Sequence, residues 1–170
     1  FGRDQLEGVA ELDGIDQPFD AATAETYAKI RGKDFFDRIL EDLRALQEVK
    51  RQRATPKPFI RLQFVLQHDN LHEIEPMIEL ARGLGANSVY YQPLETLLIP
   101  DRKSELTEGV TMEDLSRRLD SARAKAAAAG IGTNAGVLLR GLPSYYRKYE
   151  KGIPEDPPNR VCLLPWFSVY

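Results

Sequence analysis

Polar side chains gather at four points of the sequence, each directly after a short apolar segment with the character of a β-strand. These points are residues 20–23, 67–70, 92–95 and 133–134. In parallel βα folds, ligands bind where the carboxyl ends of the strands meet. The sequence therefore predicts one binding site assembled from these four segments, with Asp20 and Gln67 among its side chains.

Two further residues have side chains suited to particular ligands. The planar guanidinium group of Arg31 matches a carboxylate better than any other side chain, but an exposed arginine starting a helix would look the same. Cys162 carries the only thiol of the chain, and a single cysteine is commonly a small buried apolar residue. Residue type alone favours the structural role for both.

The two histidines, His68 and His72, are four residues apart, a spacing that binds metal when both lie on one helix. Asn70 and Pro76 disfavour a helix through both histidines, and no third ligand is near in sequence. We therefore do not expect a metal site there.

Composition excludes several classes of protein. The chain has 170 residues, 42% of them apolar, and a formal net charge of −3 without a basic stripe, so nucleic acid is not an expected partner. No apolar run approaches the ~20 residues of a membrane helix, and no signal peptide is present. A single cysteine excludes a disulfide framework. These features predict a cytoplasmic protein, and the absence of an initial Met predicts a fragment.

Alternating helical and strand patterns predict parallel strands joined by right-handed crossovers. A closed eight-stranded barrel needs about 250 residues, so about four strands correspond to half a barrel. The predicted strands are 15–21, 59–67, 87–92 and 131–134, and the predicted helices are 4–12, 34–52, 71–84, 111–130 and 141–151.

Strand 59–67 has the clearest pattern. Its apolar residues alternate with a polar set that would face the barrel lumen, formed by Arg61, Gln63 and Gln67. Either these polar side chains line a lumen that binds a ligand, or Arg61 lies in water at the strand end. In the following helix, Asn70 and Glu73 have the spacing of a capping box. Pro76 contradicts a start at Asn70, so the helix either kinks there or starts near residue 75 with Pro76 in its first turn.

Four segments, in order, resemble the radical S-adenosylmethionine (radical SAM) family. Residues 20–32 (DAATAETYAKIRG) resemble the segment after its fourth strand, S-I-D-A-A-T-x-E-T-Y-x-x-I-R-G. Residues 35–41 (FFDRILE) look like the helix that follows. Residues 64–86 resemble its fifth strand, its asparagine and the A-x-x-L-G-A stretch. Residues 160–166 (RVCLLPW) resemble the C-x-x-P-W entry to the SPASM extension, which binds auxiliary [4Fe–4S] clusters.

The resemblance implies an α/β fold, the C-terminal half of a partial (β/α) TIM-like barrel, at residues 1–151. Residues 152–170 would be a linker and the start of a SPASM-like auxiliary cluster domain. The implied cofactors are S-adenosyl-L-methionine (SAM) and [4Fe–4S] clusters. The whole enzyme would cleave SAM reductively and abstract a hydrogen atom from a peptide or small-molecule substrate, using an electron donor as partner. The long segment 93–110 would cover the substrate.

The resemblance also implies residue roles. Arg31 would bind the carboxylate of SAM, and Asp20 would lie near the cofactor, although Asp20 could instead cap the turn at residues 23–25. Gln67 would contact the ribose or adenine, or be a solvated strand end. Cys162 would be a ligand of an auxiliary cluster.

The chain departs from the family in three ways. The C-x-x-x-C-x-x-C loop that holds the radical-generating cluster is absent, so this stretch alone should be inactive. Pro18 replaces the usual Ser, and the run before it is less apolar than a buried parallel strand. Two alternatives therefore stay open: a non-catalytic βα binding domain, or an unrelated βα-barrel enzyme using carboxylates such as Asp20, Asp69 and Glu95.

Overall fold

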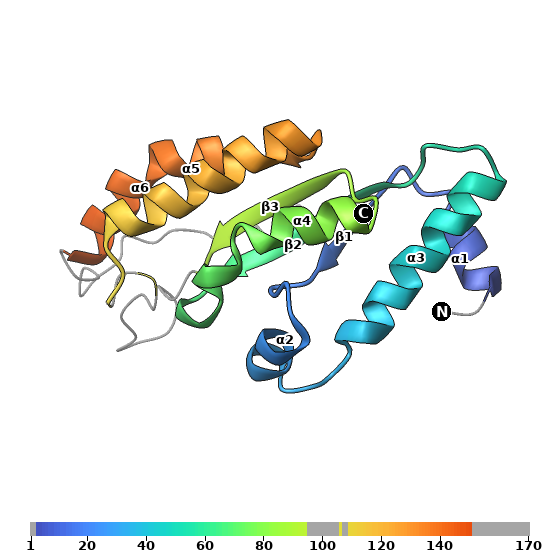
Figure 1. Ribbon diagram of the computed structural model, residues 1–170, viewed down its shortest axis with the longest axis horizontal. Helices are drawn as coiled ribbons and strands as arrows, with labels where there is room; N and C mark the ends of the chain where they lie inside the picture. The colour runs from blue at the N-terminus through green and yellow to red at the C-terminus, as the bar shows by residue number, and fades with distance from the viewer. Residues whose placement is uncertain (1–2, 95–105, 107–108, 151–170) are drawn as a thin grey trace, which may run out of the picture.

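The computed structural model describes residues 3–94, 106 and 109–150, and they form an α/β fold around one parallel sheet (Figure 1). The sheet has four strands in the order β1-β2-β3-β4, each parallel to its neighbour. The strands are β1 (Gly14–Pro18), β2 (Phe59–Leu66), β3 (Ser88–Pro93) and β4 (Gly132–Thr133). The predicted fold class is confirmed, as an open sheet consistent with part of a β/α barrel.

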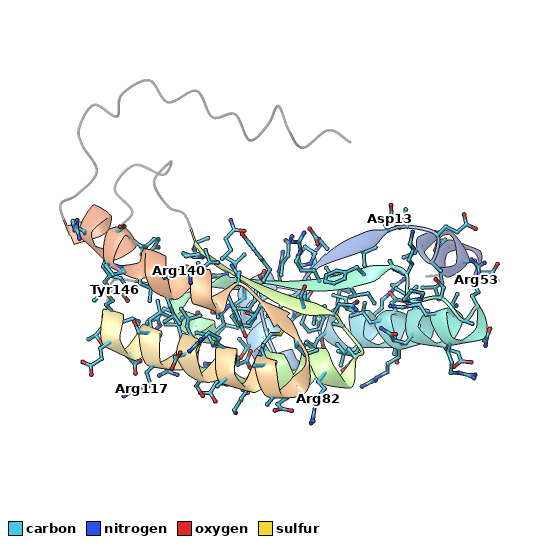
Figure 2. The ribbon with its side chains drawn as sticks, turned by 90° about the horizontal axis from the view of Figure 1, so that it is seen from above. Asp13, Arg53, Arg82, Arg117, Arg140 and Tyr146 are labelled. Atoms are coloured by element: carbon cyan, nitrogen blue, oxygen red, sulfur yellow. The ribbon has the colours of Figure 1, made fainter. Side chains whose placement is uncertain are left out.

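Helices connect the strands, and the view from above shows α4 and α5 together on one side of the sheet (Figure 2). None of the helices in the described residues combines the length and apolar character needed to cross a bilayer. The helical elements are α1 (Arg3–Val9), α2 (Ala24–Arg31), α3 (Phe36–Gln52), the 3₁₀-helix η1 (His68–Glu73), α4 (Pro76–Gly83), α5 (Met112–Ala129) and α6 (Ala135–Glu150).

Strand β2 has the two faces that its alternation predicts. Its apolar set is fully buried and belongs to the core, whereas Gln63 and Val65 on the opposite face are half-buried. On the buried face, Phe64 packs edge-on against Tyr91, with ring centroids 5.7 Å apart. The buried set of β2 is Ile60, Leu62, Phe64 and Leu66.

Backbone geometry decides one boundary and proline chemistry another. Strand β1 ends at Pro18 instead of continuing to residue 21, because Asp20 adopts a left-handed φ of 58° that no strand contains. The predicted helix 71–84 is divided into η1 and α4, and Pro76 occupies the first turn of α4, where its missing N–H is not needed. The predicted start near residue 75 is thereby confirmed.

Two predictions about helices were wrong. Helix α6 begins at Ala135 instead of residue 141, because the Asn134 carbonyl oxygen accepts hydrogen bonds from the backbone N–H groups of Val137 and Leu138. Helix α2 was not predicted as a separate helix, and Arg31 ends it instead of starting one.

The predicted extension at 152–170, and with it Cys162, lies outside the described residues, as does most of segment 93–110.

The two faces of β2 predict unequal costs of truncation. Phe64→Ala should lower the free energy of unfolding by about 3–5 kcal/mol, because it leaves a cavity beside Tyr91. Val65→Ala, one residue further on the open face, should cost much less. Urea unfolding measures both, and equal losses would contradict the assignment of the faces.

Candidate functional site

The candidate site begins in the turn that follows β1, at the carboxyl edge of the sheet. Phe19 is fully buried, and its ring lies 5.3 Å from that of Phe36 and 6.0 Å from that of Tyr27. The next residue, Asp20, has left-handed backbone geometry, which Asp tolerates better than most residues. The backbone N–H groups of Phe19 and Asp20 both donate to the Gln63 carbonyl oxygen, at 2.9 and 3.3 Å. The turn is therefore attached to the middle of β2.

The Asp20 carboxylate connects this turn to two other elements. Its Oδ1 accepts a hydrogen bond of 2.8 Å from the Val65 backbone N–H, and its Oδ2 forms an ion pair with the Arg31 guanidinium. The Asp20 side chain is only 6% exposed, whereas that of Arg31 is 39% exposed. A carboxylate this buried needs both partners to offset its desolvation. Asp20 thus attaches the end of α2 to β2.

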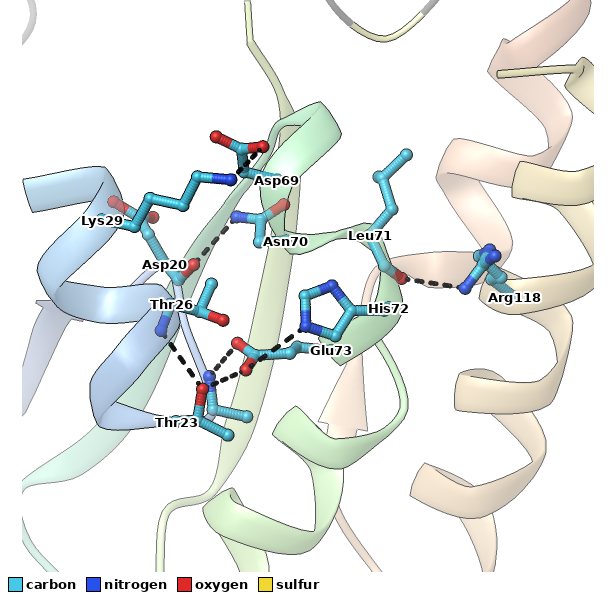
Figure 3. A network of polar contacts seen from close by, with 11 residues as sticks. Asp20, Thr23, Thr26, Lys29, Asp69, Asn70, Leu71, His72, Glu73 and Arg118 are labelled. Carbon is cyan, nitrogen blue, oxygen red and sulfur yellow. Dashed lines mark hydrogen bonds and ion pairs between the residues drawn. The ribbon is translucent and has the colours of Figure 1, made fainter. Parts of the chain in front are cut away.

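Asn70 fixes the backbone around Asp20. Its Nδ2 donates to the carbonyl oxygens of Asp20 and Val65, and its Oδ1 accepts from the Gln67 N–H, all at 2.8 Å. The Asn70 side chain is fully buried, and Figure 3 shows its contact with Asp20. Its amide therefore uses both donors and its acceptor within the protein, which joins the turn to both β2 and η1.

Glu73, the last residue of η1, holds the start of α2. Its Oε2 accepts from the Ala22 N–H at 2.7 Å, and its Oε1 accepts from the Thr23 hydroxyl at 2.5 Å. The Thr23 oxygen in turn accepts from the Thr26 N–H and is the N-cap of α2. The helix-capping role that Asp20 could have had belongs to Thr23.

A surface ion pair adds a third contact between α2 and η1. Lys29 Nζ lies 2.8 Å from Asp69 Oδ1, and both side chains are exposed. The hydrogen bond from Lys29 holds the pKa of the Asp69 carboxyl below its usual value. An exposed pair of this kind contributes little stability, so the buried contacts of Asp20, Asn70 and Glu73 carry most of the connection.

The structure brings the three predicted cofactor-binding residues to one edge of the sheet. Asp20 and Arg31 are in direct contact, and Gln67 follows β2 at the same edge. The Gln67 side chain accepts a hydrogen bond from the Asn70 N–H, in a capping box formed by these two residues. The predicted capping box of Asn70 with Glu73 was wrong, because the Glu73 side chain reaches α2 instead.

At the end of β4 the polar residues have structural roles. Asn134 bonds the backbone of Tyr91 twice, with Oδ1 accepting from the N–H and Nδ2 donating to the carbonyl oxygen, both at 2.8 Å. The Thr133 hydroxyl oxygen accepts from the Ala135 N–H at 3.2 Å. These contacts attach the start of α6 to β3.

On the polar face of the sheet, the charged side chains of Arg61 and Asp16 pair with each other. Arg61 makes a bidentate pair with Asp16, with both N···O distances 2.7 Å, and its guanidinium lies 5.5 Å from the centre of the Tyr90 ring. Gln63 also donates to Asp16, at 3.2 Å. The hydrogen bonds from Arg61 lower the pKa of Asp16. Arg61 is thus paired with Asp16 and not an isolated cation, while 42% of its side chain remains exposed to water.

The two histidines do not form the centre of a metal site among the described residues, where no group of three or more His, Cys, Asp or Glu side chains is suitably placed. His68 and His72 are both exposed, and His72 Nε2 lies 3.8 Å from Glu73 Oε1. Cys162 lies outside the described residues, so its role as a cluster ligand stays a prediction.

No protein-family model matches the chain. An 82-residue stretch, 48% of the chain, is 34% identical to proteins named Probable GTP 3',8-cyclase from Saccharolobus islandicus strains L.S.2.15 / Lassen #1 and M.14.25 / Kamchatka #1. The protein of the same name from Saccharolobus solfataricus strain P2 is 33% identical over the same length. The match spans 25% of these relatives' own length. The chain therefore has distant, partial homology to GTP 3',8-cyclases.

The satisfied amide of Asn70 predicts a large structural effect. Asn70→Ala should lower the free energy of unfolding by roughly 3 kcal/mol, because it removes hydrogen bonds of about 1 kcal/mol each and leaves buried backbone groups unpaired. The exposed neighbour His68 is the control, since His68→Ala should change stability by less than about 0.5 kcal/mol. Thermal or urea unfolding measures both variants. Equal free energies of unfolding in both variants and the parent would contradict this role of Asn70.

Proposed function

We propose that this chain supplies part of the SAM-binding wall of a radical SAM enzyme, with Arg31 binding the methionine carboxylate of the cofactor. The observation that carries the proposal is the position of Arg31. Its guanidinium is held by Asp20 at the carboxyl edge of a parallel sheet, where ligands of βα folds bind. The resemblance of residues 20–32 and the homology to GTP 3',8-cyclases support the same family.

The residues present fit a carboxylate ligand. A guanidinium has five N–H donors, and among the described residues the recorded partner of Arg31 is Asp20. The side chain is 39% exposed, so it is accessible from solvent. Arg31 can therefore keep its bond to Asp20 and still offer donors to a second carboxylate. Asp20 offsets part of the positive charge and fixes the orientation of the group.

SAM and a reduced [4Fe–4S] cluster, when bound, would supply the radical that removes a hydrogen atom from the substrate. The residues of this chain would bind and orient SAM: Arg31 at its carboxylate, and Gln67 at its ribose or adenine, with Asp20 fixing Arg31. We also propose that Cys162 is a ligand of an auxiliary cluster in a SPASM-type extension, together with cysteines that the printed sequence does not contain.

The names of the relatives favour a small-molecule substrate over a peptide. A 3',8-cyclisation of GTP joins a ribose carbon to a purine carbon and must break an unactivated C–H bond, which is radical chemistry. The chain resembles these proteins over 82 residues. We therefore propose a small-molecule substrate, with a separate electron donor as partner and the cytoplasm as the compartment.

Replacing Arg31 tests the proposal. In the full-length protein, reconstituted with iron and sulfide without oxygen, Arg31→Ala should weaken SAM binding about 10- to 100-fold, the range expected for hydrogen bonds between charged groups. The matched control is Arg51→Ala, which removes an exposed ion pair on α3. Calorimetry measures binding, and the yield of 5′-deoxyadenosine measures cleavage.

Unchanged SAM affinity in the Arg31 variant would contradict the assigned role. A parent protein that binds SAM but never cleaves it would instead support the non-catalytic binding domain.

A further inference from the structure

Glu73 is a carboxylate in an unusual setting. It is 1% exposed and lies at the end of η1, and the described residues place no Lys or Arg in an ion pair with it. Within the described part of the chain, its one basic partner is His72, at 3.8 Å, and this histidine is 64% exposed. A buried carboxylate without a strong cation needs hydrogen-bond donors to offset its desolvation.

The donors that satisfy Glu73 come from the two residues directly before α2. The Ala22 N–H and the Thr23 hydroxyl both point to it, at 2.7 and 2.5 Å, and Thr23 is the N-cap of this helix (Figure 3). A negative charge next to the start of a helix is also favoured by the helix dipole. Glu73 therefore fixes the start of α2 from a different element.

The far end of α2 carries Arg31. The helix has eight residues, too few to be stable in water by itself. Its position depends on its attachments, which are Glu73 at the start, the Arg31–Asp20 pair at the end, and the packing of Tyr27 against Phe19 and Phe36. A shift of the helix start would move the guanidinium relative to the edge of the sheet.

We infer that Glu73 is a positioning residue for anion binding by Arg31: it holds α2 by Ala22 and Thr23 so that the guanidinium faces the carboxyl edge of the sheet. This inference rests on the proposed function, because it assumes that Arg31 binds the carboxylate of SAM. Glu73 itself is too buried to contact the ligand, and it acts through the helix.

The experiment measures SAM affinity by calorimetry in the full-length, reconstituted protein. Glu73→Ala should weaken binding about tenfold. Glu73→Gln should retain more affinity, because its amide oxygen can still accept from the Ala22 N–H. Thr23→Val breaks the same contact from the helix side and should weaken binding in the same direction. The matched control is Glu75→Ala, which removes an ion pair of 2.8 Å with Lys125 on the α5 side and should leave affinity unchanged.

The double variant separates positioning from general loss of structure. In the Arg31→Ala background, Glu73→Ala should cause no further loss of SAM affinity, because the group that Glu73 positions is already gone. Hydrogen exchange should rise at residues 22–31 in Glu73→Ala and stay at the parent level in β2.

Three results would overturn the inference. If Arg31→Ala loses SAM affinity but Glu73→Ala and Thr23→Val both keep the affinity of the parent, the inference is overturned and the role of Arg31 stands. Independent, additive losses from Glu73→Ala and Arg31→Ala would assign Glu73 a structural role only. A parent protein without any SAM binding would overturn the proposed function, and this inference with it.

Discussion

A buried carboxylate, that of Asp20, is the interaction on which the site depends. It accepts the Val65 N–H on one oxygen and pairs with the Arg31 guanidinium on the other. These contacts also hold Asp20 in a left-handed conformation, which is uncommon outside glycine and persists only where surrounding contacts enforce it. The Asp20 side chain therefore connects three segments: the turn after β1, the end of β2 and the last turn of α2.

The polar side chains around Asp20 are more deeply buried than the charged side chains on the open face of the sheet. Asn70 and Glu73 are 0% and 1% exposed and have their hydrogen bonds satisfied within the protein, so they form a rigid network in a medium of low polarity. The Asp16–Arg61 pair on the open face of the sheet has comparable geometry, but both of its side chains are 42% exposed. Water screens that pair. The network at the carboxyl edge is therefore less screened by water than the pair on the open face.

Periodicity allowed the sheet to be predicted from the sequence. The alternation in β2 and the helical repeat of α3 follow from local physics, and Pro76 favoured the start of α4 near residue 75 because proline lacks an N–H. Helix α2 was not predicted, because its eight residues depend on contacts with η1 and β2 that lie far away in sequence. For the same reason Glu73 appeared to be part of a local capping box. The resemblance placed Asp20 and Arg31 in one segment, and the structure places them in contact; whether they bind SAM remains the proposal.

The attachment of Arg31 to Asp20 is tested most directly by a double-mutant cycle on the free energy of unfolding. Asp20→Asn keeps an acceptor for the Val65 N–H and tolerates left-handed geometry, so, with Arg31→Met, the cycle isolates the ion pair. The account predicts a coupling free energy above the ~1 kcal/mol that exposed pairs reach. Effects of the two substitutions that add within about 0.5 kcal/mol would contradict it.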